Sequence, residues 1–201
     1  TIYTGSPLRN FVCKHMTPNY AFALPALNIS GGIMVAIKHA IILQDQGYDV
    51  MLLNDNEATA TPWCEYENHR FPVLGQDIKN FNGRIDTAIA TMWTTMTFVE
   101  QYYNIEKRKY LVQGYETDFY PKSNPLRIQA NRTYFPTREI QFLTISKWCQ
   151  EWLKERFGRD AEYAPDGLDV ERYQFVERKA SGKCRILIEG DCAVDYKNID
   201  E

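Results

Sequence analysis

Short apolar runs alternate with amphipathic helical patterns along most of this chain. An apolar run at 20–27 comes first, and the turn Asn28–Gly32 follows it. Apolar positions then repeat at helical spacing from Ile33 to Ile41, before a second apolar run at 49–53. This pattern predicts a strand, a helix and a parallel strand, with Pro25 favouring an edge position or an irregular end for the first strand.

The alternation continues to residue 164, although the middle is less regular and the segment 54–70 has the character of a loop. The further expected elements are strands at 71–74, 86–92, 109–113, 140–145 and 161–164, and helices after Trp93-Thr94, from Pro125 and after Ser146. In the last helix we expect Trp148, Cys149, Trp152 and Leu153 to form the buried stripe, and Gly158 to end it. Alternating strands and helices favour an α/β fold, with a Rossmann-like parallel sheet flanked by helices.

The composition changes after the Pro165–Gly167 turn. A charged stretch at 170–183 leads to a new apolar run, Arg185–Glu189, and then to Gly190. A single strand cannot bury its own faces, so this run should either belong to a second domain that continues beyond Glu201 or pair with the first sheet as an additional strand. The expected organisation is an N-terminal lobe at 1–170, a linker at 171–184 and the first strand of a truncated C-terminal lobe at 185–201.

The composition narrows the classes of function. The 201 residues are 44% hydrophobic and 24% charged, as in ordinary globular proteins, and the formal charge of −3 lacks the basic excess of a general nucleic-acid binder. Five scattered cysteines without a C-x-x-C pair indicate a reduced compartment. No secretory leader pattern or membrane-length apolar run occurs, so we expect a cytoplasmic protein, for which peripheral contact with the inner face of the membrane stays open.

The turn Ser30-Gly31-Gly32 before a helix is the sharpest local feature. Glycine lets a ligand approach the backbone, and a helix N-terminus offers free N–H groups to phosphate or sugar hydroxyls. A tight turn that merely needs glycine is an equal alternative. The third glycine of G-x-G-x-x-G and the Lys-Ser/Thr of a P-loop are both missing, which disfavours a dehydrogenase and a phosphate-cleaving motor.

Polar or aromatic residues follow most of the expected strands, at the sheet edge where α/β proteins bind ligands. They are Asn28, Asn54-Asp55, Trp93-Thr94, Gln113, Ser146-Lys147 and Asp166. Most could bond sugar hydroxyls, and Trp93 could stack on a sugar ring. Each alone is more simply a cap or turn residue, so the argument depends on their convergence. The three histidines lack metal-ligand spacing, so no metal is expected, and His69 is only a weak candidate base; the catalytic residue stays unknown.

Several segments resemble glycosyltransferases of the GT-B fold, in particular the retaining family 4 type. Leu27–Gly32 with the strand "GYDVMLL" is similar to that family's opening glycine loop, and "FLTISKWCQEWLKERFG" to the strand and helix before its hinge. "APDGLDVERYQF" resembles its N-G-V-D segment, with Asp166 in place of Asn, and "RILIEGD" the first strand of the donor lobe. The block from Ala90 to Pro121 resembles bacterial rhamnosyltransferases of cell-surface glycan synthesis.

The resemblance implies that this chain is the N-terminal lobe of a GT-B enzyme, which receives a glycan or lipid-linked glycan acceptor. The second lobe would hold a nucleotide diphosphate sugar as donor, without a further cofactor and without nucleic acid, and this chain alone should be inactive. The expected substrate-binding residues are Asn28, Ser30, Gly31, Gly32, Trp93, Thr94 and Gly190. Two alternatives stay open: a sugar-nucleotide epimerase on the same fold, and a non-enzymatic α/β binding module.

Overall fold

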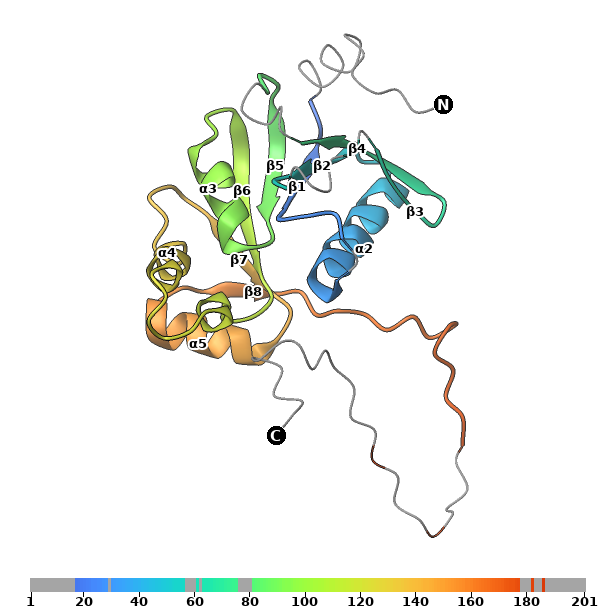
Figure 1. Ribbon diagram of the computed structural model, residues 1–201. Coiled ribbons are helices and arrows are strands. Elements are labelled where there is room, and N and C mark those ends of the chain that lie inside the picture. The colour runs from blue at the N-terminus through green and yellow to red at the C-terminus, as the bar shows by residue number, and fades with distance from the viewer. Residues whose placement is uncertain are drawn as a thin grey trace. The chain divides into compact units, whose positions relative to one another are not determined.

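The computed structural model describes residues 17–28, 30–56, 61, 63–75, 81–177, 182 and 186. The chain separates into two units, Thr1–Pro165 and Asp166–Glu201, and the described helices and strands all belong to the first (Figure 1). In the second unit the described residues are exposed. They include a turn in which the Asp169 carboxylate accepts hydrogen bonds from the backbone N–H groups of Glu171 and Arg172.

In the described part of the chain, eight strands form one sheet in the order β3-β4-β2-β1-β5-β6-β7-β8. They are β1 (Tyr20–Leu24), β2 (Val50–Asn54), β3 (Trp63–Tyr66), β4 (His69–Leu74), β5 (Ile85–Ala90), β6 (Ile105–Val112), β7 (Gln141–Thr144) and β8 (Ala161–Tyr163). Only β3 and β4 pair antiparallel; all other neighbours are parallel. Without β3, the strands follow the Rossmann order 3-2-1-4-5-6, extended by a seventh strand.

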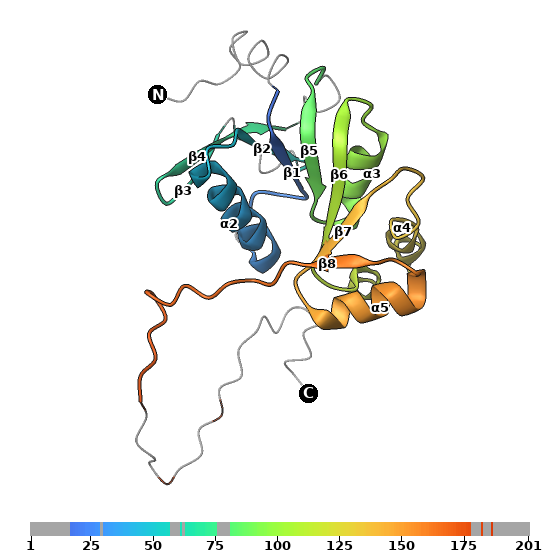
Figure 2. The same ribbon diagram turned by 180° about the vertical axis from the view of Figure 1, so that it is seen from behind.

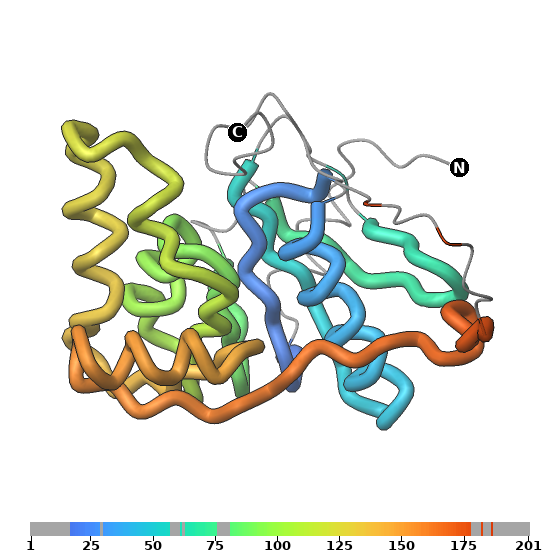
Figure 3. Tube along the Cα trace, turned by 90° about the horizontal axis from the view of Figure 1, so that it is seen from below, coloured from blue at the N-terminus to red at the C-terminus, as the bar shows by residue number. Residues whose placement is uncertain are grey.

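Helices flank both faces of this sheet (Figure 2). They are α2 (Gly31–Asp45), α3 (Trp93–Gln101), α4 (Leu126–Arg132) and α5 (Lys147–Phe157), with a short 3₁₀ helix, η3 (Glu116–Phe119). α2 packs on one face, α3 and α5 pack on the other, and α4 lies beside α3 and η3. The end-on view of Figure 3 separates α2 in blue from α4 in yellow and α5 in orange. The predicted α/β fold with a Rossmann-like sheet and flanking helices is confirmed.

The central strand β1 explains why the apolar runs are nearly continuous. Ala21 and Ala23 face the layer of α3 and α5, whereas Phe22 and Leu24 face α2, and all four side chains are buried. Successive side chains of a strand point to opposite faces, so a strand covered on both faces must be apolar at every position. The small alanines leave room for the larger side chains of the α3 layer, such as Met96.

Local sequence signals set the ends of α5 as predicted. The Ser146 side chain accepts a hydrogen bond from the backbone N–H of Cys149 at 3.1 Å, which caps the helix. Gly158 ends it in the left-handed conformation, with φ of 64°. Cys149, Trp152 and Leu153 form the buried stripe, but the prediction that Trp148 belongs to it is wrong, because that side chain is 59% exposed.

Three element boundaries differ from the prediction. β1 lies at the centre of the sheet, so the expected edge position is wrong, whereas the other expectation, a strand end at Pro25, agrees with the end of β1 at Leu24. The proline costs no ladder bond because it lies outside the strand. The expected loop at 54–70 contains the β3–β4 hairpin, whose turn includes Glu67 with φ of 54°. β4 pairs with β2 only through Val73 and Leu74, next to Pro72, which has no N–H to donate.

The other boundary errors concern β5 and β6. The strand expected to end at Trp93-Thr94 ends at Ala90, and Trp93 is instead the first residue of α3. β6 begins at Ile105 and not at 109.

None of the helices in the described part of the chain has the length and apolar character needed to cross a membrane. The expected strand at 185–201, with Gly190, lies outside the described residues apart from Ile186, and the predicted linker and second lobe remain predictions.

Candidate functional site at the carboxyl edge of the sheet

The strand order reverses between β1 and β5, which is where open α/β sheets bind ligands. Chain leaving β1 enters α2 on one face, and chain leaving β5 enters α3 on the other. The backbone N–H and the hydroxyl group of Thr91, just after β5, both donate to the carbonyl oxygen of Ala23 in β1, at 3.2 and 2.8 Å. The two strands therefore end at one edge, and the starts of α2 and α3 lie at that edge.

The start of α2 carries four of the predicted residues. Asn28, Ser30, Gly31 and Gly32 are all exposed. Ser30 occupies the N-cap position in an extended conformation, and its hydroxyl group makes no capping hydrogen bond. The first N–H groups of a helix have no partner within the helix, so this turn offers backbone donors and a hydroxyl group to a ligand.

Gln113, immediately after β6, reaches the same turn from a third strand. Its Nε2 donates to the carbonyl oxygen of Gly32 at 3.2 Å. A Cβ atom on Gly32 would lie 3.3 Å from this amide, whereas a Cβ atom on Gly31 would meet nothing within 4 Å. Gln113 was among the polar residues expected at this edge, and the structure places its amide beside the glycine turn.

The start of α3 is less open than the start of α2. The Trp93 side chain is only 9% exposed, its indole N–H donates to the hydroxyl oxygen of Tyr120 at 3.0 Å, and the two rings meet edge to face. The Oγ1 atom of Thr94 is buried and has no hydrogen-bond partner among the described residues. These contacts give the Trp93 ring a structural role, and its stacking on a sugar stays a prediction.

Two other residues of the predicted edge, Asn54 and Ser146, have turn and cap roles. The Asn54 side chain exchanges two hydrogen bonds with the backbone of Asn56, and Ser146 caps α5. His69 is not placed to act as a base at this edge. It begins β4 at the amino edge of the sheet, where its Nε2 lies 2.8 Å from the Asp45 carboxylate at the end of α2.

Glu116, which sequence reasoning missed, is the most unusual group near this edge. It is the first residue of η3 and is 3% exposed. Its Oε2 atom accepts hydrogen bonds from the backbone N–H of Trp93 at 2.5 Å and from the hydroxyl group of Tyr110 at 3.0 Å. Burial raises the pKa of this carboxyl group to about 8, although both hydrogen bonds act to lower it. The group therefore keeps its proton at neutral pH.

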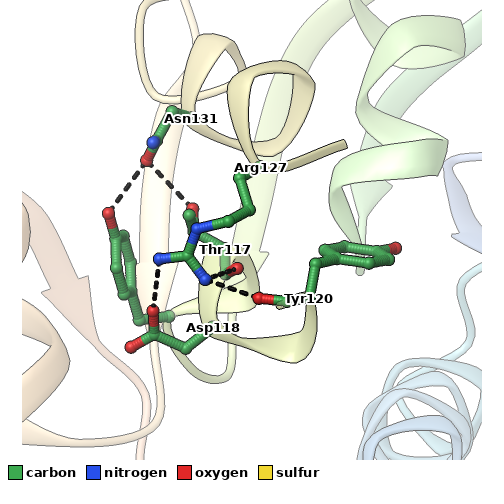
Figure 4. A network of polar contacts seen from close by, with 6 residues as sticks. Thr117, Asp118, Tyr120, Arg127 and Asn131 are labelled. Atoms are coloured by element: carbon green, nitrogen blue, oxygen red, sulfur yellow. Dashed lines mark hydrogen bonds and ion pairs between the residues drawn. The ribbon is translucent and has the colours of Figure 1, made fainter. Parts of the chain in front are cut away.

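The guanidinium group of Arg127 on α4 donates hydrogen bonds to the η3 turn (Figure 4). Its Nη1 atom donates to the carbonyl oxygens of Thr117 and Tyr120 at 2.8 and 2.6 Å, and its Nη2 atom to the Asp118 carboxylate at 2.9 Å. A planar guanidinium group presents such donors in a fixed fork. The turn that carries both partners of Trp93, Glu116 and Tyr120, is thereby fixed to α4.

Asn131, one turn further along α4, adds a second fixing point. Its Oδ1 atom accepts hydrogen bonds from the hydroxyl groups of Tyr115 and Thr117 at 3.0 and 2.9 Å. Together with Arg127 it determines the path of the chain from β6 to Tyr120. No sequence motif marks this network, since Glu116 in "QGYETDFYP" has the ordinary composition of a polar turn.

The described residues of the site offer hydrogen-bonding groups and no assembled nucleophile. Backbone N–H groups, the Ser30 hydroxyl group and the Gln113 amide suit sugar hydroxyls or phosphate oxygens. Among the described residues no group of three or more His, Cys, Asp and Glu side chains is placed to hold a metal ion. Gly190, the remaining predicted residue, lies outside the described part of the chain. Neither a protein-family model nor a curated protein matches this chain.

Proposed function

We propose that this chain is the acceptor-binding lobe of a glycosyltransferase that moves a sugar, with rhamnose as the candidate, from a nucleotide diphosphate sugar to a glycan acceptor. The strand order, with its reversal between β1 and β5, is the observation that carries this proposal. The resemblance of the sequence to GT-B enzymes supports it. The setting we propose is bacterial surface glycan synthesis at the cytoplasmic side of the membrane.

The groups at this edge favour a polyhydroxylated ligand over a flat apolar one. Asn28, Ser30 and Gln113 supply amide and hydroxyl groups that both donate and accept hydrogen bonds. Sugar hydroxyls have the same dual character, so each can be paired. The exposed Gly31 allows close approach of a ligand to the first turn of α2, where phosphate oxygens of the donor would also be stabilised.

A retaining transfer does not require this lobe to supply a catalytic base. When the leaving phosphate takes the proton of the acceptor hydroxyl, the protein contributes positioning and charge stabilisation instead of a base of its own. We assign the positioning of the acceptor to the carboxyl edge of this sheet and most of the donor contacts to a second lobe. β8 is parallel to β7 and so ends at the carboxyl edge as well, at the end of the sheet beyond β6 and β7.

The proposal is tested by ligand binding to this chain. Saturation-transfer NMR with oligosaccharide acceptors should detect binding that the variant Gln113→Ala weakens, and calorimetry with UDP- and dTDP-sugars should detect weak binding or none. The exposed Gln129 on α4 gives the matched control, Gln129→Ala, which should bind glycans like the wild type. Micromolar affinity for a nucleotide sugar would instead locate the donor site on this lobe.

A transfer assay tests the reaction itself. The product of the natural coding sequence, supplied with dTDP-rhamnose and an oligosaccharide, should release dTDP and extend the glycan, while the 201-residue chain alone should not. Conversion of the nucleotide sugar without any acceptor would contradict the proposal and indicate an epimerase. Absence of binding to every glycan and nucleotide sugar would favour a binding module without enzymatic activity.

A further inference from the structure

Glu116 joins three elements at the candidate site. It belongs to η3, it accepts a hydrogen bond from Tyr110 of β6, and it accepts another from the backbone N–H of Trp93, the first residue of α3. Met92, at the N-cap position of α3, has no oxygen in its side chain. The Glu116 carboxyl group therefore serves the first turn of α3 in the way that a capping side chain usually does.

The surroundings of this carboxyl group hold no counter-charge. The phenols of Tyr110 on β6 and Tyr134 after α4 face it, and Tyr115 and the Cys149 thiol of α5 lie next to Tyr134. Arg127 of α4 is engaged by Asp118 and by two backbone carbonyl groups of the turn. Within the described residues no cation pairs with Glu116, so an ionised Glu116 would be a buried, uncompensated charge.

Such a charge gains most by reaching water. η3 lies near the surface, since its Asp118 and Phe119 are exposed, so a change in the side-chain conformation of Glu116 would bring its carboxylate toward water while Arg127 keeps the turn on α4. That movement would break the hydrogen bond to the Trp93 N–H. The start of α3 would then be held by the hydrogen bond from the Trp93 indole to Tyr120 and no longer by the one from its backbone N–H to Glu116.

We propose that Glu116 is a positioning residue: its protonated carboxyl group ties the start of α3 to β6, and its ionisation releases this tie and loosens the edge at Trp93 and Thr94. The inference goes beyond the proposed function, because it concerns a proton on the free protein and applies to any ligand of this edge. According to this proposal, the start of α3 becomes less ordered when the pH turns alkaline.

NMR of the free wild-type chain tests the tie directly. The ¹³C resonance of the Glu116 carboxyl group and the backbone amide resonance of Trp93 are followed between pH 5 and 9.5. We expect one shared midpoint near pH 8, and the indole N–H of Trp93 should shift with the same midpoint. A Glu116 carboxyl group that titrates near its ordinary value of 4.5 would overturn the proposal, and so would a Trp93 amide that ignores the titration.

The variant Glu116→Gln separates the proton from the shape of the side chain. Its amide oxygen can still accept from Trp93 and Tyr110 but cannot ionise, so the shift of the Trp93 resonances near pH 8 should vanish. Glu151→Gln, at an exposed position of α5, is the matched control and should keep the shift. A shift that persists in Glu116→Gln overturns the proposal; should this variant fail to fold, the carboxyl resonance of the wild type decides. No ligand enters either measurement, so the outcome is independent of the transfer assay.

Discussion

The side-chain amide of Gln113 lies against Gly32, donating to its carbonyl oxygen at 3.2 Å, while the neighbouring Gly31 has open space around its Cα atom. Two adjacent glycines of one helix start thus have different surroundings. Gly32 lies where the end of β6 meets α2, and Gly31 faces no described neighbour. The pair can therefore separate the conformational role of glycine from its role in leaving space.

Gly31→Ala should stabilise the protein by about 0.5–1 kcal/mol, because alanine restricts the unfolded chain and meets no neighbour in the first turn of α2. Gly32→Ala should lack this gain, because its methyl group must displace the Gln113 amide. Urea unfolding of both variants measures the difference. Equal gains at both positions would show that Gln113 yields without cost.

The two serine N-caps give a second comparison. Ser146→Ala should cost about 1 kcal/mol of stability, because the hydroxyl group accepts from the backbone N–H of Cys149. Ser30→Ala should change stability by much less, because the Ser30 side chain makes no capping hydrogen bond to α2. Thermal or urea unfolding checks both values. If the two substitutions cost the same, the Ser30 hydroxyl group caps α2 in solution and is not free for a ligand.

Arg127→Ala should destabilise the turn that supports Trp93. It removes donors to two carbonyl groups and to the Asp118 carboxylate, and we expect a loss of about 1–3 kcal/mol. Amide hydrogen exchange at 116–120 should accelerate together with that of Trp93. Arg132→Ala, at the exposed end of the same helix, is the control, and its unfolding free energy should stay within about 0.5 kcal/mol of the wild type.

The free energy of unfolding should depend on pH because of Glu116. Its folded-state pKa of about 8 lies above the unfolded value of 4.5, so the folded state binds the proton more tightly. The stabilising contribution is complete below pH 4.5 and is lost as the pH rises to 8, with a slope of about 1.4 kcal/mol per pH unit between these values. Glu116→Gln should lack this slope, and the difference between the two urea-unfolding profiles isolates it from the other carboxylates.

The sequence was sufficient for the central strands and the helices that follow them. β1, β2 and the start of α2 are predictable because a strand buried on both faces is apolar throughout and because glycine and serine mark the turn. The first half of β6 was not predicted, because its residues Glu106, Lys107 and Arg108 are charged and do not form an apolar run. This end of the strand is not covered on both faces. β3 was missed for a similar reason, being an edge strand with alternate residues exposed.

For the site, strand polarity was predictable and side-chain burial was not. Parallel strands end at one edge, so the placement of Gly31 and Trp93 at that edge followed from the order of the elements. The burial of Trp93 depends on Tyr120 and Glu116, which reach it because α4 folds over η3 and holds it with Arg127. Contacts between segments more than twenty residues apart leave no pattern in a single sequence.

The β3–β4 hairpin also has a practical consequence. Its turn, Glu67–Asn68, is exposed and lies at the amino edge, away from Gly31 and Trp93, and only Val73 and Leu74 join the hairpin to β2. An affinity tag or a fluorescent reporter inserted between Glu67 and Asn68 would leave the ligand edge unobstructed for surface immobilisation.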